Sequence, residues 1–138
     1  TPQALSGSLW SITNALPLHN IWCVFGCGGD RDKKKRPEMA QIAESLANHV
    51  IVTNDNPRTE DEDKIIMEIT SGFESETSYK VILDRKEAIY YCLSKIAKST
   101  DNNVLLIAGK GHEEYQEING KRTPFSDKEV VESYYINS

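Results

Sequence analysis

The 138-residue sequence predicts an α/β protein with a mostly parallel sheet, helices on both faces of that sheet, and an antiparallel hairpin near the C-terminus. Three observations predict this fold class. Short apolar runs alternate with segments whose apolar residues recur at helical spacing, which is the pattern of βαβ units. The runs are nearly continuous in apolar residues, as expected for strands buried on both faces. An Asn-Gly pair late in the chain favours a tight hairpin turn.

The first half of the chain begins with a helix and continues with two strands separated by a second helix. Apolar residues at helical spacing predict the first helix over 1–16, and the run NIWCVFG at 20–26 predicts the first strand. The next helix occupies 37–46, because Pro37 is suited to a first helical turn. HVIVT at 49–53 then reads as the second buried strand.

The second half repeats the alternation. Thr59 and Glu62 form a capping box that begins the third helix. YKVIL at 79–83 predicts the third strand, and Asp84 caps the helix that follows it. NVLLIAG at 103–109 is the fourth and most apolar strand.

The end of the chain predicts a hairpin and one more helix. Its features are the Asn119-Gly120 turn and a final helix capped by Ser126 and Glu129. Because strands alternate with helices before this hairpin, the chain predicts a single Rossmann-like domain.

Composition limits the classes of partner. The formal net charge of -5 argues against a nucleic-acid or anionic-membrane partner, because such binding depends on basic patches. The 3 cysteines form neither a disulfide framework nor a paired zinc-ligand pattern, so we expect a reducing compartment. No apolar run approaches the roughly 18 residues that span a bilayer. We therefore expect a cytoplasmic protein with neither a nucleic-acid nor a membrane partner.

Three loops rich in glycine, proline and charge leave the carboxyl edge of the predicted sheet, where α/β proteins bind ligands. Their sequences are GCGGDRDKKKRP, NDNPRTE and GKGHEEY. The first does not complete the dinucleotide pattern G-x-G-x-x-G, because its sixth position is Arg31. The third is not a phosphate-binding P-loop, since Val104 and Gly111 stand where that motif needs a glycine and a Ser or Thr.

Two arginines in these loops are candidate carboxylate ligands. Arg31 lies within the glycine turn of the first loop, where its planar fork of donors can be held for a carboxylate. In the second loop, Pro57 fixes its own φ and restricts Asn56, so the direction of Arg58 is set in advance. The basic run at 33–36 is expected to be a solvated face.

The third loop adds a candidate ammonium site. Gly109 and Gly111 allow close backbone approach to a ligand, and Glu113 can accept an ammonium group. His112 is either a base or a histidine hydrogen-bonded within its loop, and Lys110 has no assigned role. Two arginines and a glutamate facing one crevice fit a small ligand with carboxylates and an ammonium, such as an amino acid.

Three stretches carry a family resemblance: VFGCGGDRDKKKRPEMAQIA, VTNDNPRTE and LLIAGKGHEEYQ. They resemble the C-terminal domain of the Mur ligases, and the likeness covers nearly all of residues 1–135. It implies that residues 1–138 form an amino-acid-binding domain, in which residues 1–19 are a helix leading in from a central ATPase domain. In this family, the Asp-Asn-Pro-Arg tetrad is typical of members that add meso-diaminopimelate rather than lysine.

The resemblance assigns roles to residues, with no catalytic group and no metal ligand among them. Arg58 would bind the carboxylate at the distal, non-reacting centre of the amino acid, and Arg31 the carboxylate beside the reacting amine. The Gly109 carbonyl and Glu113 would hold the distal ammonium. The tetrad that forms the recognition motif comprises Asp55, Asn56, Pro57 and Arg58.

The implied activity is that of an ATP-dependent, ADP-forming amide ligase that extends UDP-N-acetylmuramoyl-L-Ala-D-Glu in peptidoglycan synthesis. ATP and Mg²⁺ would bind mainly to a central domain that these residues do not contain, so we expect no cofactor on this segment. We also expect no turnover by it alone, because its partners would include the N-terminal and central domains. Alternatives are a lysine-adding ligase, a folylpolyglutamate synthetase-like ligase, and a non-catalytic α/β amino-acid-binding module.

Overall fold

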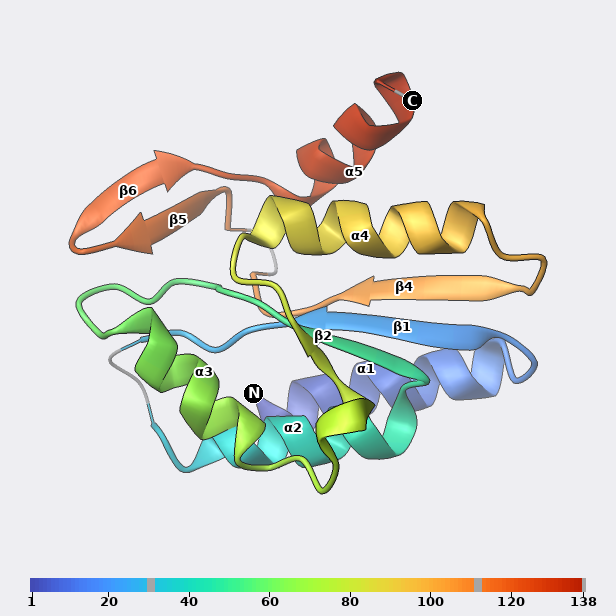
Figure 1. Cartoon of the computed structure of the whole chain (residues 1–138), viewed down its shortest axis with the longest axis horizontal. Coiled ribbons are helices and arrows are strands. Elements are labelled where there is room, and N and C mark those ends of the chain that lie inside the picture. The colour runs from blue at the N-terminus through green and yellow to red at the C-terminus, as the bar shows by residue number, and fades with distance from the viewer. Residues whose placement is uncertain (30–31, 111–112, 138) are drawn as a thin grey trace.

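The computed structural model describes residues 1–29, 32–110 and 113–137, and its centre is a parallel sheet (Figure 1). The strands are β1 (Asn20–Phe25), β2 (His49–Val52), β3 (Lys80–Val81) and β4 (Asn103–Ile107), in the order β3-β2-β1-β4. Strand β1 is central, and Val24 aligns with Ile51 on one side and Ile107 on the other. All neighbouring pairs in this sheet are parallel, which confirms the predicted α/β arrangement.

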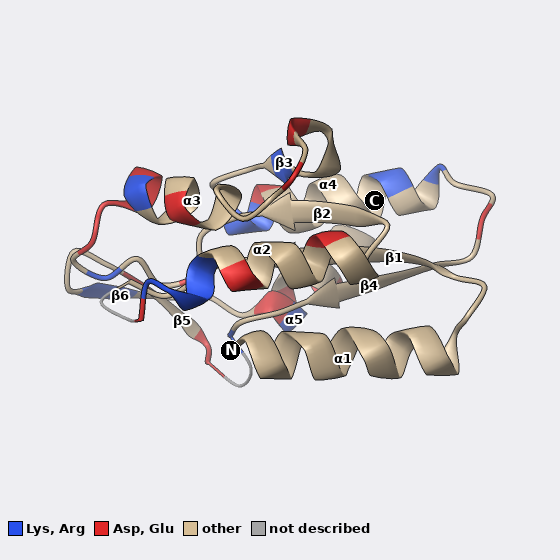
Figure 2. Cartoon of the chain, turned by 90° about the horizontal axis from the view of Figure 1, so that it is seen from below, with Lys and Arg blue, Asp and Glu red and all other residues tan. Residues whose placement is uncertain are grey.

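Helices cover both faces of the sheet (Figure 1). One face carries α1 (Pro2–Ala15), α2 (Lys35–Leu46) and α3 (Glu62–Thr70), and the other carries α4 (Arg85–Ala97) and α5 (Asp127–Ile136). A short 3-10 helix, η1 (Glu76–Ser78), precedes β3. Helix α1 contains no charged residue, which makes it uniform in colour in Figure 2.

The core is divided by the sheet, because successive side chains of a strand point to opposite faces. Cys23 and Phe25 of β1 pack with α1, α2 and α3, whereas Trp22 and Val24 pack with α4. A third cluster joins α4 to α5 through Ile89 and other buried residues. This alternation explains why β1 is apolar along nearly its whole length.

The C-terminal hairpin forms a separate two-stranded sheet, as predicted. Strands β5 (Tyr115–Ile118) and β6 (Lys121–Pro124) pair antiparallel around a turn in which Asn119 and Gly120 have φ values of 52° and 76°. Asn and Gly are the residues that adopt such positive φ values most readily. Arg58, in the loop after β2, forms a parallel bridge with Ile118 and so fixes the hairpin against that loop.

Several element boundaries differ from the prediction. Helix α2 begins at Lys35 rather than Pro37, so the proline stands in the first turn without opening it. Helix α3 is capped by Asp61, whose side chain accepts from the Asp63 amide, and the predicted Thr59 cap is wrong. The reason is a turn closed by a hydrogen bond from the Glu60 amide to the Pro57 carbonyl, which delays the helix.

The third strand is shorter than the predicted 79–83: β3 covers Lys80–Val81, at the edge of the sheet with β2 as its neighbour. The chain still continues beside β2, where the Ile82 amide donates to the Val52 carbonyl. The predicted caps of α4 and α5 are confirmed: Asp84 accepts from the Glu87 amide, and Ser126 accepts from the Glu129 amide.

Candidate functional site

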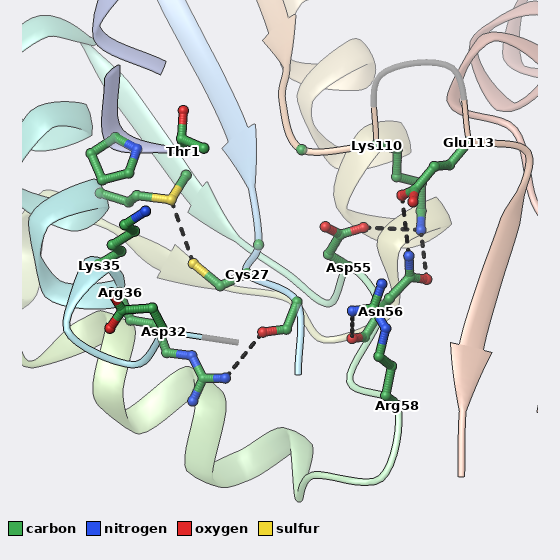
Figure 3. Close-up of a pocket in the computed structure, with 15 residues that line it drawn as sticks. Thr1, Cys27, Asp32, Lys35, Arg36, Asp55, Asn56, Arg58, Lys110 and Glu113 are labelled. Carbon is green, nitrogen blue, oxygen red and sulfur yellow. Dashed lines mark hydrogen bonds and ion pairs between the residues drawn. The ribbon is translucent and has the colours of Figure 1, made fainter. Parts of the chain in front are cut away.

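A cavity of about 590 Å³ lies where β1, β2 and β4 end. Its walls come from the three loops that follow these strands, together with the starts of α1 and α2 (Figure 3). The cavity therefore lies at the carboxyl edge of the sheet, where the sequence places it. Asp55, Asn56, Arg58, Gly109 and Glu113 all line it, so five of the predicted site residues are brought together.

Arg58 extends along the cavity wall and is held by main-chain carbonyls. Its Nη1 donates to the carbonyl oxygen of Asn56 at 3.2 Å and to that of Gly29 at 3.3 Å. Among the described residues, no carboxylate lies within ion-pair distance of its guanidinium. The charge of Arg58 is thus oriented within the domain without being neutralised by the described residues.

The backbone of Arg58 is unusual, with φ at 55°. This left-handed conformation is unfavourable for a residue with a Cβ, and such residues persist where their surroundings hold them. The Arg58 amide donates to the Glu117 carbonyl at 2.9 Å, and its carbonyl accepts from the Asn119 amide. The hairpin thereby holds Arg58, a role that the sequence prediction had given to Pro57 alone.

Pro57 does not face the cavity as a ligand. It is fully buried, and it contacts the glycine turn after β1, where the Gly29 amide donates to the Asn56 carbonyl at 2.7 Å. A Cβ at Gly29 would overlap the Pro57 carbonyl. The close approach of these two loops requires a glycine at this position.

Asp55 and Asn56 are buried beneath the cavity and meet a third buried residue, Lys110. The Lys110 Nζ lies 3.0 Å from Asp55 Oδ1 and 3.2 Å from Asn56 Oδ1. Asn56 Oδ1 also accepts from the Glu117 amide at 2.9 Å. The polar groups of Asn56 are therefore used within the domain, which makes it a support of the cavity more than a direct ligand.

Glu113 is held in one orientation by two donors. Its Oε1 accepts from Asn56 Nδ2, and its Oε2 accepts from the Tyr115 hydroxyl, each at 3.2 Å. Gly109 lies nearby with φ at 117°, a conformation suited to glycine, and Asp55 Oδ2 would lie 3.3 Å from a Cβ there. A carboxylate with fixed orientation next to an accessible backbone is a suitable acceptor for an ammonium group.

The basic run after β1 divides into solvated and buried residues. Lys33, Lys34 and Lys35 are exposed as expected, but Arg36 is buried, which corrects the prediction for this residue. Arg36 binds Glu60 through two hydrogen bonds of 2.7 and 2.9 Å and Glu68 through one of 2.6 Å. A guanidinium can pair two carboxylates at once, so Arg36 connects the start of α2 to α3.

Cys27 lines the cavity beside Met39, with 3.7 Å between the two sulfur atoms. Burial raises the pKa of its thiol to about 11, so the group is neutral at physiological pH. All three cysteines are free thiols.

Some predicted residues lie outside the described part of the chain, and one important residue was missed. Arg31, Gly111 and His112 fall in the undescribed positions. Lys110 had no assigned role, although it contacts two residues of the recognition tetrad. A lysine between two glycines after the most apolar strand is the signal that could have identified it.

Within the described residues, no helix is long and apolar enough to cross a membrane. Those residues also contain no group of three or more His, Cys, Asp or Glu side chains placed to hold a metal ion.

Comparisons with known proteins agree with the geometry. UDP-N-acetylmuramoyl-L-alanyl-D-glutamate--2,6-diaminopimelate ligase from Haemophilus ducreyi is 53% identical over 137 residues, which cover 97% of this chain and 26% of the relative. The Pseudomonas aeruginosa protein of the same name is 49% identical over 135 residues, covering 96% of this chain and 26% of the relative. The chain thus spans about a quarter of the length of these curated relatives.

A solved structure of a protein with the same name superposes with a TM-score of 0.89 at 43% identity, covering 99% of this chain and 28% of that one. The family model described as "Mur ligase, glutamate ligase domain" matches residues 1–111, most of the chain. Together with the relatives, this match shows that the chain belongs to the Mur ligase family, in its glutamate ligase domain.

Proposed function

We propose that this chain is the amino-acid-binding domain of an ATP-dependent, ADP-forming amide ligase that adds meso-diaminopimelate to UDP-N-acetylmuramoyl-L-Ala-D-Glu in peptidoglycan synthesis. The observation that carries the proposal is that a cation and an anion line the same cavity. Arg58 presents a cation without a described carboxylate partner, and Glu113 presents an oriented carboxylate. An amino acid with a carboxylate and an ammonium at its distal centre complements both groups.

In this proposal the distal carboxylate of the amino acid meets Arg58, and the distal ammonium meets Glu113 and the Gly109 carbonyl. Asp55, Asn56 and Pro57 support these groups from below. Arg31 would meet the carboxylate beside the reacting amine. Lysine lacks the distal carboxylate, so its binding would leave the Arg58 guanidinium desolvated and without an anion.

The proposed contribution of this domain to the reaction is positional. The amine of the bound amino acid would attack an acyl phosphate formed by ATP on the D-Glu side-chain carboxylate, so that the amide bond forms as phosphate leaves and the amine loses a proton. Holding the amine in place converts a bimolecular encounter into a directed one. Residues 1–138 are the C-terminal domain, and 1–19 lead in from a central domain. ATP and Mg²⁺ bind mainly to that central domain, and the enzyme acts in the cytoplasm.

The alternatives differ in the amino acid that the cavity selects. A lysine-adding ligase does not need the Arg58 charge, and a folylpolyglutamate synthetase-like ligase takes glutamate. A non-catalytic module would bind an amino acid without supporting ligation. The oriented Glu113 in the same cavity as Arg58 favours an amino acid whose distal centre carries both charges.

The test measures the binding of meso-diaminopimelate and of L-lysine to the chain by NMR titration. The wild-type chain should prefer meso-diaminopimelate, and Arg58→Ala should reduce that preference by at least about ten-fold, since a hydrogen bond to a charged group is lost. Lys128→Ala is the control, because it removes one exposed positive charge on α5. Equal binding of both amino acids by the wild-type chain would refute the proposal.

A further inference from the structure

Lys110 is a buried cation whose ammonium protons are all used within the domain. Its side chain is 1% exposed, and Nζ donates to Asp55 Oδ1 at 3.0 Å, Asn56 Oδ1 at 3.2 Å and the Tyr115 carbonyl at 3.0 Å. A lysine ammonium has three donors. Lys110 therefore has no donor left for a ligand, although it lines the cavity, and its influence on a ligand passes through its neighbours.

The first of these neighbours is a second anion at the cavity. Asp55 lines the cavity with a side chain that is 10% exposed, and Lys110 is its ion-pair partner (Figure 3). The opposite charge of Lys110 balances Asp55, so Asp55 does not act as an additional unpaired anion beside Arg58 and Glu113, which line the same cavity. Without Lys110, the Asp55 carboxylate would act on the ligand directly, and in a poorly solvated site such a charge acts strongly.

The second neighbour is Asn56, whose amide has two possible orientations. Its Oδ1 accepts from both Lys110 Nζ and the Glu117 amide, so Nδ2 must point to Glu113 Oε1. With Tyr115 on its other oxygen, Glu113 is fixed from both sides. Lys110 thereby sets the orientation of the carboxylate that faces the ligand, without touching the ligand.

We propose that Lys110 is a specificity-determining positioning residue: it neutralises Asp55 and orients Asn56, so that a ligand's distal carboxylate meets Arg58 without repulsion from Asp55. This inference rests on the proposed function, in which the cavity selects meso-diaminopimelate over lysine. Removing the Lys110 charge leaves Asp55 to repel the distal carboxylate of meso-diaminopimelate. The same unbalanced charge attracts the side-chain ammonium of lysine, so discrimination between the two amino acids falls.

The experiment compares Lys110→Met with Lys128→Met. Both variants lose one positive charge, but Lys128 is an exposed residue of α5, with a side chain that is 85% exposed. Dissociation constants for meso-diaminopimelate and L-lysine are measured by NMR titration of the 138-residue chain, and circular dichroism checks the fold. Lys110→Met should lower the ratio of the two affinities about ten-fold or more, because like charges in an interface are strongly unfavourable. Lys128→Met should keep the ratio within about two-fold of wild type, because exposed charges are screened.

The outcomes separate this inference from the proposed function. A wild-type chain that binds both amino acids equally removes the proposed function, and the inference with it. If the wild-type chain discriminates and the affinity ratio is the same in Lys110→Met as in Lys128→Met, the inference is overturned. The proposed function is then unaffected. If Lys110→Met does not fold, Asp55→Asn takes its place. That variant leaves the Lys110 charge unbalanced and should raise the ratio in favour of meso-diaminopimelate, and an unchanged ratio overturns the inference.

Discussion

Gly29 packs so closely against Pro57 that a Cβ atom at position 29 would overlap the Pro57 carbonyl, and its amide donates to the Asn56 carbonyl at 2.7 Å. This contact joins the loop after β1 to the loop after β2. Arg58 also donates to the Gly29 carbonyl, so the same contact supports the guanidinium at the cavity.

Gly29→Ala should therefore destabilise the chain by about 2 kcal/mol or more, because the obstacle is backbone that must move. Gly7→Ala is the matched control, since Gly7 lies exposed in α1 with nothing within 4 Å of an added Cβ. That change should stabilise the chain by about 0.5–1 kcal/mol. Urea unfolding measures both, and equal stability of the two variants would contradict the close approach.

Arg58 combines an unfavourable backbone conformation with a functional side chain, and two substitutions separate these contributions. Glycine accepts φ near 55° without a Cβ penalty, whereas alanine does not. We expect Arg58→Gly to be about 1 kcal/mol more stable than Arg58→Ala in urea unfolding. Both variants should lose the preference for meso-diaminopimelate to the same extent. If Arg58→Ala were the more stable variant, the left-handed conformation would not be a source of strain.

Arg36 holds two carboxylates in place, so its loss should be costly. Arg36→Met leaves Glu60 and Glu68 without their shared cation, and removing one partner of a buried ion pair costs about 3–5 kcal/mol. The control is Lys33→Met. The Lys33 side chain is 52% exposed, and its Nζ lies 4.0 Å from Glu60 Oε2. That change should cost less than about 1 kcal/mol. Thermal unfolding of the two variants measures the difference, and similar midpoints would contradict the role given to Arg36.

The sequence predicted the sheet, the helices and the hairpin, because these depend on local signals. Buried parallel strands show as apolar runs, and Asp84, Ser126 and the Asn119-Gly120 turn each act on their immediate neighbours. The third helix began late because a turn after Pro57 took precedence over the cap predicted at Thr59. Such competition between two local motifs has no visible signal in the sequence.

The sequence predicted several residues that line the cavity, but it did not predict the buried ion pairs that hold the surrounding loops in place. The strand ends placed Arg58, Gly109 and Glu113 together, because all three follow parallel strands of one sheet. Lys110 and Arg36 were not assigned from sequence, because their carboxylate partners lie far away along the chain. Glu60 is 24 residues from Arg36, and Asp55 is 55 residues from Lys110. Without knowledge of such a distant partner, a charged residue is predicted from sequence to be exposed to solvent.

Cys27 should show a shifted pH profile of alkylation. Burial raises the pKa of its thiol to about 11, from an ordinary value of 9.0, and the reactive species is the thiolate. At pH 8 the thiolate should therefore be about a hundred-fold less populated in the folded chain than in the denatured chain. The alkylation rate of Cys27 should rise about ten-fold per pH unit and level off near pH 11.

Mass spectrometry after timed iodoacetamide treatment assigns the rate to each cysteine. Cys23 and Cys92 are fully buried in the core and serve as internal controls that should react more slowly than Cys27 at every pH at which the chain stays folded. Burial raises the pKa of each of them to about 12, so their profiles should also level off later. A Cys27 profile that levels off near pH 9 would mean that the thiol is fully hydrated, which contradicts a half-buried thiol in the cavity wall beside Met39.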